Sequence, residues 1–404
     1  MWFVFAGGGT GGHLFPALAV VDELRALAAG TSDAEGATRH GIDVSFLCTP
    51  RPIDAQVLGA AQIEAIRQPV KPFTVRPWRW PAFWSAWRAS LAHCRTLFRA
   101  RRPAAVVGAG GYASGPAVRV ALDEGIPTFL LNPDAIPGRA NRYLAGHKAM
   151  AGIFAQWEVT RKHLPASAPV AVTGCPVRRA FHEADGRDRG ELLRSFELDP
   201  DRRVLLVTGA SQGARTINEA MIALAETLDW DGWQILHLAG QADVERVSAA
   251  YGQAFRRRHG TARVLAFTDR MGEAMAAADL VISRAGASTL AELLVLGKPS
   301  ILLPYPYHRD HHQRRNAEVL AEAGAAVLID DAREVPLNRV RLEAALGPLL
   351  KDDAQRDAMA RSARSLAQPE SGRRIAQRLL EAGRASLESA CELCGCEPVS
   401  TATQ

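Results

Sequence analysis

Three glycine-rich segments in this chain each follow an apolar run and precede a helical pattern. They are Phe3-Val-Phe-Ala-Gly-Gly-Gly-Thr-Gly-Gly-His13, Val106-Val-Gly-Ala-Gly-Gly-Tyr-Ala-Ser-Gly-Pro116 and Leu205-Leu-Val-Thr-Gly-Ala-Ser-Gln-Gly-Ala214. Glycine lets the backbone approach a ligand closely, and a helix that begins there presents free N–H groups and the positive end of its dipole. The segments therefore predict turns that bind anions, with phosphate groups as the natural ligands.

Strand-like runs alternate with helical patterns along the whole chain. The expected strands are 2–6, 44–48, 104–108, 128–132, 153–156 and 170–173, then 203–208, 234–238, 263–267, 280–283, 299–304 and 326–329. Such alternation is typical of parallel βα units. Because each half opens with a strand, a glycine-rich turn and a helix, we predict an α/β fold. It consists of two doubly wound Rossmann-like domains facing across a cleft, with the ligand at the carboxyl ends of the strands.

The length of 404 residues agrees with two domains, and a hydrophobic content of 48% can supply both cores. We expect an N-terminal domain over 1–173, a C-terminal domain over 174–365, a helix over 366–388 that packs back, and a polar tail over 389–404. Residues 182–194 are expected to form a charged connector, and residues 30–41 a surface loop.

We expect the protein to function in a reducing cytosol, because we find no secretory signal before the first expected strand. No run approaches the roughly 18 apolar residues of a membrane span, so any membrane contact is expected to be peripheral. Cys391, Cys394 and Cys396 lack a nearby histidine and lie in a polar tail, so we expect no metal site there.

The first glycine-rich turn is not a good dinucleotide fingerprint. Its spacing differs, and Thr49-Pro-Arg-Pro stands after the second strand where an acidic residue is usual, which disfavours a hydride-transfer enzyme. His13 lies at the start of a helix whose apolar face includes Leu14 and Leu18. The helix dipole disfavours the imidazolium there, so His13 is either a neutral ring able to act as a base or a polar residue that caps the helix.

The segment from Ser283 to Glu292 also allows two interpretations. Thr289-Leu-Ala-Glu292 has the spacing of a capping box, in which the carboxylate binds an N-terminal N–H. A carboxylate at this place could instead accept hydrogen bonds from both hydroxyls of a ribose. The polar set in Asp310-His-His-Gln-Arg-Arg-Asn-Ala317 is either an ordinary helix start or part of the same ligand site.

Six motifs together resemble those of the MurG family, the UDP-N-acetylglucosamine:N-acetylmuramyl-(pentapeptide) pyrophosphoryl-undecaprenol N-acetylglucosamine transferases. Their order and approximate spacing match the family over roughly residues 1–365. The motifs are Gly-Gly-Thr-Gly-Gly-His13, Gly-Gly-Tyr-Ala-Ser-Gly-Pro116, Val172-Thr-Gly-Cys-Pro-Val-Arg178, Ala210-Ser-Gln-Gly-Ala214, Ser283-Arg-Ala-Gly-Ala-Ser-Thr-Leu-Ala-Glu292 and Asp310–Ala317.

The resemblance implies a GT-B glycosyltransferase of peptidoglycan synthesis that converts lipid I to lipid II at the cytoplasmic face of the bacterial cell membrane. The first domain would bind the lipid acceptor and the membrane, and the second would bind UDP-GlcNAc. The implied donor residues are Thr10, Gly11, Gly12, Asp134, Arg178, Ser211, Gln212, Thr268, Ala287, Ser288, Thr289, Leu290, Ala291, Glu292, His312, Gln313 and Asn316. The implied acceptor residues are Gly111, Tyr112 and Ser114.

Within that set, the resemblance assigns individual roles. Ser211 and Gln212 would meet the diphosphate, the Thr268 backbone the uracil, and Gln313, Asn316 and His312 the sugar hydroxyls. The acceptor's 4-hydroxyl would attack the anomeric carbon with inversion, and His13 is the candidate base. Helix N-termini and Arg178 would stabilise the leaving diphosphate, so the mechanism requires no bound metal, and the sequence leaves dependence on divalent ions open.

One stretch departs from the family pattern. Leu131-Asn-Pro-Asp-Ala135 stands where the family has roughly His-Glu-Gln-Asn-Ala, so Asp134 replaces an asparagine. A carboxylate accepts but cannot donate an amide hydrogen bond, and it repels phosphate. We expect the local contact to change while the reaction class stays the same, with Asn132 as a possible substitute.

Residues 69–103 combine basic and aromatic side chains without one acidic residue. The members are Lys71, Arg76, Arg79, Arg88, Arg95, Arg99, Arg101, Arg102, Phe73, Trp78, Trp80, Phe83, Trp84, Trp87 and Phe98. This composition indicates an interfacial membrane patch, centred on the tryptophans. The alternatives are a solvated basic face with the tryptophans in the core, and a nucleic-acid surface. A polyprenyl-linked acceptor favours an anionic membrane surface, with no nucleic-acid partner.

Two other enzyme classes remain to be distinguished. A UDP-sugar 2-epimerase of the same fold would keep the nucleotide site but would not need Gly110–Pro116 or the patch at 69–103. A pyridine-nucleotide oxidoreductase would bind NAD(P)H, which a binding measurement can exclude.

Overall fold

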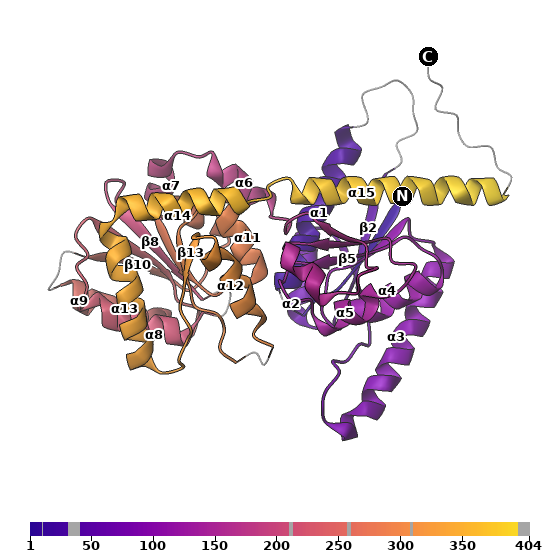
Figure 1. Cartoon of the computed structure of the whole chain (residues 1–404), viewed down its shortest axis with the longest axis horizontal. Helices are drawn as coiled ribbons and strands as arrows, with labels where there is room; N and C mark the ends of the chain where they lie inside the picture. The colour runs from indigo at the N-terminus through magenta and orange to yellow at the C-terminus, as the bar shows by residue number, and fades with distance from the viewer. Residues whose placement is uncertain (10, 31–40, 210–212, 257–259, 308–309, 395–404) are drawn as a thin grey trace, which may run out of the picture. The chain divides into compact units, whose positions relative to one another are not determined.

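The computed structural model describes residues 1–9, 11–30, 41–209, 213–256, 260–307 and 310–394. The chain divides into two compact units. Figure 1 shows the helices and strands of both. Unit 1 consists of Met1–Pro176 and Glu370–Gln404, and unit 2 of Val177–Pro369. Each unit is built on a parallel sheet with flanking helices, so the predicted α/β, two-domain fold is confirmed.

Unit 1 contains a seven-stranded sheet in the order β3-β2-β1-β4-β5-β6-β7. Its strands are β1 (Trp2–Ala6), β2 (Asp43–Cys48), β3 (Glu64–Arg67), β4 (Ala105–Gly108), β5 (Thr128–Asn132), β6 (Gly152–Ala155) and β7 (Val170–Val172). Its helices are α1 (Gly11–Gly30), α2 (Pro52–Ala60), η1 (Pro77–Arg79), α3 (Trp80–Ala100), α4 (Ser114–Asp123), α5 (Arg139–Ala145), η2 (Glu158–His163) and α15 (Ser371–Cys394).

The side chains of β1 alternate between the two cores of unit 1, as the period of a strand requires. Phe3 and Phe5 lie in one core with residues of α1 and α15, including Leu379. Val4 lies in the other core with Phe98 of α3. Helices α1 and α15 therefore cover one face of the sheet, where Figure 1 shows them close together, and α3 and α4 cover the other.

Unit 2 contains a six-stranded sheet in the order β10-β9-β8-β11-β12-β13. Its strands are β8 (Arg203–Thr208), β9 (Trp233–Leu238), β10 (Thr261–Leu265), β11 (Leu280–Ser283), β12 (Ser300–Leu302) and β13 (Ala326–Leu328). Its helices are α6 (Arg179–Asp185), α7 (Arg189–Ser195), α8 (Arg215–Ala225), α9 (Val244–Phe255), α10 (Met271–Ala277), α11 (Ala287–Val295), α12 (His312–Glu322), α13 (Val335–Lys351) and α14 (Asp353–Leu366).

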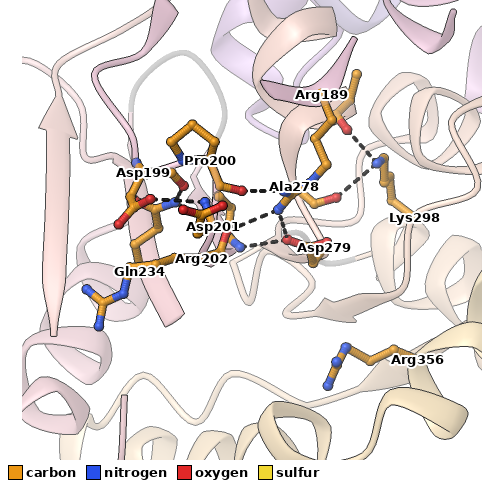
Figure 2. A network of polar contacts seen from close by, with 12 residues as sticks. Arg189, Asp199, Pro200, Asp201, Arg202, Gln234, Ala278, Asp279, Lys298 and Arg356 are labelled. Carbon is orange, nitrogen blue, oxygen red and sulfur yellow. Dashed lines mark hydrogen bonds and ion pairs between the residues drawn. The ribbon is translucent and has the colours of Figure 1, made fainter. Parts of the chain in front are cut away.

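A polar network at the amino ends of the unit 2 strands fastens α7 to the sheet (Figure 2). The Arg189 guanidinium donates to Asp279 Oδ2 at 2.5 Å, and the same oxygen accepts the Val204 N–H at 2.7 Å. Lys298 donates to the carbonyls of Ala276 and Ala278 at 2.7 and 2.9 Å, and burial lowers the pKa of its ammonium group to about 8. These groups lie at the amino ends of the strands, away from the carboxyl ends where a ligand is expected, so we assign them a structural role.

All the strands expected from the sequence occur, with ends shifted by one or a few residues. The expectation missed β3, a short edge strand that alternates polar and apolar residues. The segment expected to be a charged connector, 182–194, instead contributes to α6 and α7 within unit 2. Residues 31–40 and Cys396 lie outside the described residues. Within the described ranges, no helix combines the length and the apolar character that crossing a membrane requires.

Candidate functional site

The first two glycine-rich turns lie side by side in unit 1. Strand β1 pairs with β4 in register, with Ala6 opposite Gly108, and the strand order reverses at this pair. Ligands of doubly wound sheets bind at the carboxyl ends of the strands at such a switch point. The turns after β1 and β4 therefore form one candidate anion site.

His13 lies in the first turn of α1, against the backbone of the second turn. A Cβ added at Gly110 would lie 2.9 Å from His13 Nδ1, and one added at Gly111 would lie 3.4 Å from Cδ2. Both glycines have positive φ angles, +105° and +74°, which other residues rarely adopt. The sequence needs glycine here because the imidazole occupies the space beside the turn.

The other residues expected around this site differ in accessibility. Gly12 is exposed, and Gly11, Gly111 and Tyr112 are half-buried. Ser114 has a fully buried side chain, and its hydroxyl donates to the Gly111 carbonyl at 2.8 Å. It therefore supports the turn, and its expected contact with the acceptor stays a prediction. Thr10 lies outside the described residues.

Asp134 is half-buried after β5, whereas Asn132 is occupied by internal hydrogen bonds. The Asn132 side-chain amide donates to the Asp134 carbonyl at 2.7 Å, and its oxygen accepts from Asn141 at 3.1 Å. Asn132 is only 2% exposed. It therefore shapes the loop that carries Asp134, and the suggestion that it could replace the missing asparagine is wrong for this conformation.

Unit 2 repeats the same arrangement at β8 and β11, where the strand order reverses and Thr208 pairs with Ser283. The third glycine-rich turn follows β8, and the turn 284–286 follows β11. A side chain at Gly213, whose φ is +73°, would collide with the Ala239 carbonyl, so Gly213 packs directly on the residue that follows β9. Ser211 and Gln212 lie outside the described residues.

Glu292 lies inside α11 and faces Arg178. The helix begins after Gly286, which makes no side-chain capping bond, so the capping-box interpretation of Thr289 and Glu292 is wrong. Arg178 Nη2 donates to Glu292 Oε1 at 3.3 Å. Burial raises the pKa of the Glu292 carboxyl to about 7, an effect that Arg178 opposes. The two residues were expected from separate motifs, and the structure brings them together.

The remaining donor residues lie on several elements of unit 2. Thr268 is 9% exposed, and its hydroxyl accepts the Arg270 N–H at 3.1 Å. His312 Nδ1 bonds with Asp310 Oδ1 at 2.8 Å, and the Gln313 side-chain oxygen accepts the Tyr305 N–H at 2.9 Å.

Several of these residues are buried. Ser288 and Thr289 are half-buried, whereas Ala287 and Ala291 are buried. Leu290 and Asn316 are fully buried in this structure, and their expected contacts with the donor stay predictions.

A buried ion pair behind the unit 2 turns was missed by the sequence reasoning. Arg284 donates to Asp331 Oδ2 at 2.8 Å and to Thr216 Oγ1 at 2.9 Å, and Asn338 donates to the other Asp331 oxygen at 2.7 Å. The network ties the turn after β11 to the start of α8. The position of Arg284 inside a small-residue turn was its only sequence signal.

The patch at 69–103 divides into two parts. Helix α3 buries Ala86, Ser90, Cys94 and Phe98, four residues apart, and leaves the opposite side exposed. Arg95 and Arg99 in its second half, and Arg101 directly after it, form ion pairs with acidic residues outside α3. The positive charge of these arginines is therefore compensated. The basic character of that half is therefore largely neutralised.

The first half of the patch is aromatic and exposed. Trp78, Trp80 and Trp84 are 73%, 42% and 52% exposed, and Arg76, Arg79 and Arg88 are exposed as well. A hollow of about 650 Å³ is lined by Pro81, Trp84, Ser85 and Arg88. Trp87 differs from its neighbours, because it is half-buried and its ring lies 2.9 Å from where a Gly115 Cβ would be.

No cluster of three or more histidine, cysteine or acidic side chains able to hold a metal ion occurs among the residues that the structure describes. This statement does not include Cys396, and the side chains of Cys391 and Cys394 are likewise not described.

Comparison with known families matches both units. Residues 3–152 match the glycosyltransferase family 28 N-terminal domain, and residues 204–379 match the glycosyltransferase family 28 C-terminal domain. The crystal structure of Acinetobacter baumannii MurG is similar, with a TM-score of 0.70 and 26% identity over 94% of this chain and 99% of that one. A UDP-GlcNAc 2-epimerase from Neisseria meningitidis, at 16% identity and a TM-score of 0.64, shares the fold.

Curated relatives extend over nearly the whole chain. The UDP-N-acetylglucosamine--N-acetylmuramyl-(pentapeptide) pyrophosphoryl-undecaprenol N-acetylglucosamine transferase of Desulforamulus reducens is 35% identical over 371 residues, which are 91% of this chain and 95% of the relative. The protein of the same name from Leifsonia xyli subsp. xyli is 37% identical, over 90% of this chain and 94% of the relative. This chain therefore belongs to glycosyltransferase family 28 and, within it, to the MurG family of N-acetylglucosamine transferases.

Proposed function

We propose that this protein transfers N-acetylglucosamine from UDP-GlcNAc to the 4-hydroxyl of N-acetylmuramic acid in undecaprenyl-pyrophosphoryl-MurNAc-pentapeptide, with inversion. The observation that carries the proposal is a switch point in the strand order of each unit, in a chain related to such transferases over nearly its full length. Both substrates contain a diphosphate, so a transferase can use one switch point for each substrate. The curated relatives favour the transferase over the 2-epimerase, which shares the fold.

We assign the donor to unit 2. Arg178 contacts Glu292 within α11. The guanidinium can bind a phosphate there, and the carboxylate can accept hydrogen bonds from ribose hydroxyls. The third glycine-rich turn, braced by Ala239, would hold the diphosphate at the start of α8. The buried network of Arg284, Asp331 and Thr216 supports this assignment by tying the turn after β11 to the start of α8.

We assign the acceptor and the base to unit 1. The acceptor diphosphate would lie at the start of α4, next to Gly111 and Tyr112, and His13 would take the proton of the attacking hydroxyl. The acceptor oxygen forms a bond to the anomeric carbon of GlcNAc while the bond from that carbon to UDP breaks on the opposite face. Helix N-termini and Arg178 stabilise the diphosphate that leaves. None of the roles assigned here requires a bound metal.

Because the proposed acceptor is a membrane lipid, the protein must also bind a membrane surface. The exposed tryptophans around α3 can insert into the membrane interface, and the exposed arginines there attract an anionic surface. Trp87 packs on Gly115, at the start of the helix to which we assign the acceptor diphosphate. The patch thus contacts the start of α4 within unit 1, which supports binding of the protein to a membrane surface. In our proposal, this surface is the cytoplasmic face of the cell membrane.

An acceptor-dependence measurement tests this proposal against the epimerase alternative. UDP-GlcNAc incubated with the protein alone should remain unchanged and should be consumed only when a short-chain lipid I analogue is added. Chromatographic appearance of UDP-ManNAc without acceptor would support the epimerase and contradict the proposal. A titration with NAD(P)H should show no binding, since binding would indicate an oxidoreductase.

A further inference from the structure

A fully buried acidic side chain lies directly behind the first glycine-rich turn. Asp54 belongs to the first turn of α2, the helix that follows β2, and is 0% exposed. Its carboxylate accepts the Gly9 N–H on both oxygens, at 2.9 and 3.1 Å. It also accepts the N–H of Thr49 at 3.1 Å and its hydroxyl at 2.5 Å. A buried carboxylate with this many donors is well satisfied, and its position is therefore closely defined.

The turn is shaped around this carboxylate. Gly8 and Gly9 have φ angles of +126° and +87°, and a Cβ at Gly8 would collide with Asp54 Oδ2. Arg51, directly before α2, donates to the Gly9 carbonyl at 2.9 Å. The two peptide groups that flank Gly9 are thus bound on one side by Asp54 and on the other by Arg51. Isolated glycines would sample many conformations, so these contacts select one of them.

The selected conformation reaches the site of His13. The Gly8 carbonyl lies 3.2 Å from where a Gly111 Cβ would be, so the clamped turn touches the second glycine-rich turn. The chain enters α1 at Gly11, and His13 follows in that first turn. Any shift of Gly8 and Gly9 would therefore move the entry to α1 relative to Gly110 and Gly111.

We propose that Asp54 is a positioning residue for the transfer reaction: with Arg51 it clamps the first glycine-rich turn and so sets His13 against the acceptor turn. The inference rests on the proposed function, because its effect is measured as the rate of the transfer reaction. Asp54 is fully buried and binds Gly9 and Thr49, so its effect on the reaction is indirect. A displacement of about 1 Å at a reacting group is enough to lower a rate about 10²-fold.

Asp54→Asn tests the clamp. An amide offers one oxygen and turns its N–H toward the donors of Gly9 and Thr49, so the turn should loosen while the shape of the side chain is kept. We expect kcat with a water-soluble acceptor to fall about 10²-fold while the KM for UDP-GlcNAc stays the same. Hydrogen exchange of a peptide that contains Gly7–Gly9 should become faster. Asp43→Asn, which removes an exposed carboxylate of the same unit, is the matched control and should change neither quantity.

Arg51→Ala keeps the test decisive if Asp54→Asn does not fold. Arg51 is exposed, so its removal should leave the fold intact, release the Gly9 carbonyl and lower kcat in the same direction but less. Faster exchange with kcat equal to that of Asp43→Asn would overturn the inference. Inactivity of the wild-type protein toward lipid I analogues would instead refute the proposed function, and the exchange measurement would still report on the clamp.

Discussion

The Arg178 guanidinium lies 3.3 Å from the Glu292 carboxylate, and the pair joins the segment before α6 to α11. Glu292 is buried, whereas the Arg178 side chain is 30% exposed. The arginine is therefore partly accessible to solvent, whereas the carboxylate is not. In our proposal, a bound nucleotide meets Arg178 with a phosphate and Glu292 with its ribose.

Glu292→Ala should raise the KM for UDP-GlcNAc strongly. Loss of one partner of a charged hydrogen bond costs about 1–3 kcal/mol, which corresponds to roughly a 5- to 150-fold change. Glu292→Gln keeps one accepting oxygen and should have a smaller effect. Steady-state kinetics provide the measurement, with Glu183→Ala as a control that removes an exposed acid of the same unit. A KM for Glu292→Ala equal to that of the control would remove Glu292 from the donor site.

Donor affinity should also depend on pH near neutrality. Burial raises the pKa of Glu292 from 4.5 to about 7, with Arg178 opposing the rise, so the carboxylate forms only as the pH passes 7. The diphosphate diester of UDP-GlcNAc does not titrate there, so calorimetric affinity should increase from pH 6 to pH 8. Glu292→Gln should flatten the profile, and an unchanged profile in that variant would assign the titration to another group.

The same pKa has a consequence for stability. Because the native state holds this proton more tightly than the unfolded chain, the contribution of Glu292 to stability is largest at acidic pH and decreases as the pH rises from 4.5 toward 7. Denaturant unfolding of the wild-type protein and Glu292→Gln should therefore differ in pH slope over this range. Parallel slopes would contradict the raised pKa.

His13→Ala should lower kcat by about 10²–10⁴, the usual scale for a positioned proton acceptor. UDP binding should hardly change, since we assign the nucleotide to unit 2. His163→Ala, which removes an exposed imidazole of unit 1, is the control. If His13→Ala kept more than half of the activity, the base would lie elsewhere, and Asp134 is the next residue to replace.

The exposed tryptophans should carry membrane binding that salt does not weaken. Each basic residue near an anionic surface contributes about 1 kcal/mol, which salt screens, whereas buried aromatic rings are insensitive to salt. Replacement of Trp78, Trp80 and Trp84 by Ser should abolish vesicle co-sedimentation in high salt and leave activity on a water-soluble acceptor intact. Equal co-sedimentation of the folded variant would contradict the patch.

Trp87 should behave differently from those three tryptophans. Since its ring packs on Gly115, Trp87→Ser should lower the melting temperature and also the activity on a soluble acceptor. Unchanged stability would show that the contact with Gly115 contributes little.

The sequence predicted the sheets well because both are parallel and buried. Strands such as β1 and β8 contain buried apolar runs, and each is followed by glycines that favour a turn. The edge strand β3 was missed, since Glu64-Ala-Ile-Arg67 is short and half exposed and carries no comparable signal. The charged segment 182–194 lacked an apolar stripe long enough to indicate the two short helices it contributes to.

Side-chain pairings depended on tertiary contacts that no local pattern contains. Glu292 and Thr289 have capping-box spacing, but α11 begins at Ala287, so only the fold shows Arg178 as the partner of Glu292. Asp54 was missed for a related reason: an acid was sought directly after the second strand, whereas it lies a few residues later, in the next helix. The burial of Ser114 and Asn316 likewise depends on the fold and could not be predicted from their local sequence.

The most direct test of the central claim is the product formed from radiolabelled UDP-GlcNAc and a short-chain prenyl-pyrophosphoryl-MurNAc-pentapeptide. We predict acceptor-dependent release of UDP together with a lipid-linked disaccharide in which GlcNAc is joined β to the 4-position of MurNAc, as determined by mass spectrometry and NMR. Release of UDP without the disaccharide, conversion of the donor to UDP-ManNAc, or an α linkage would contradict the account.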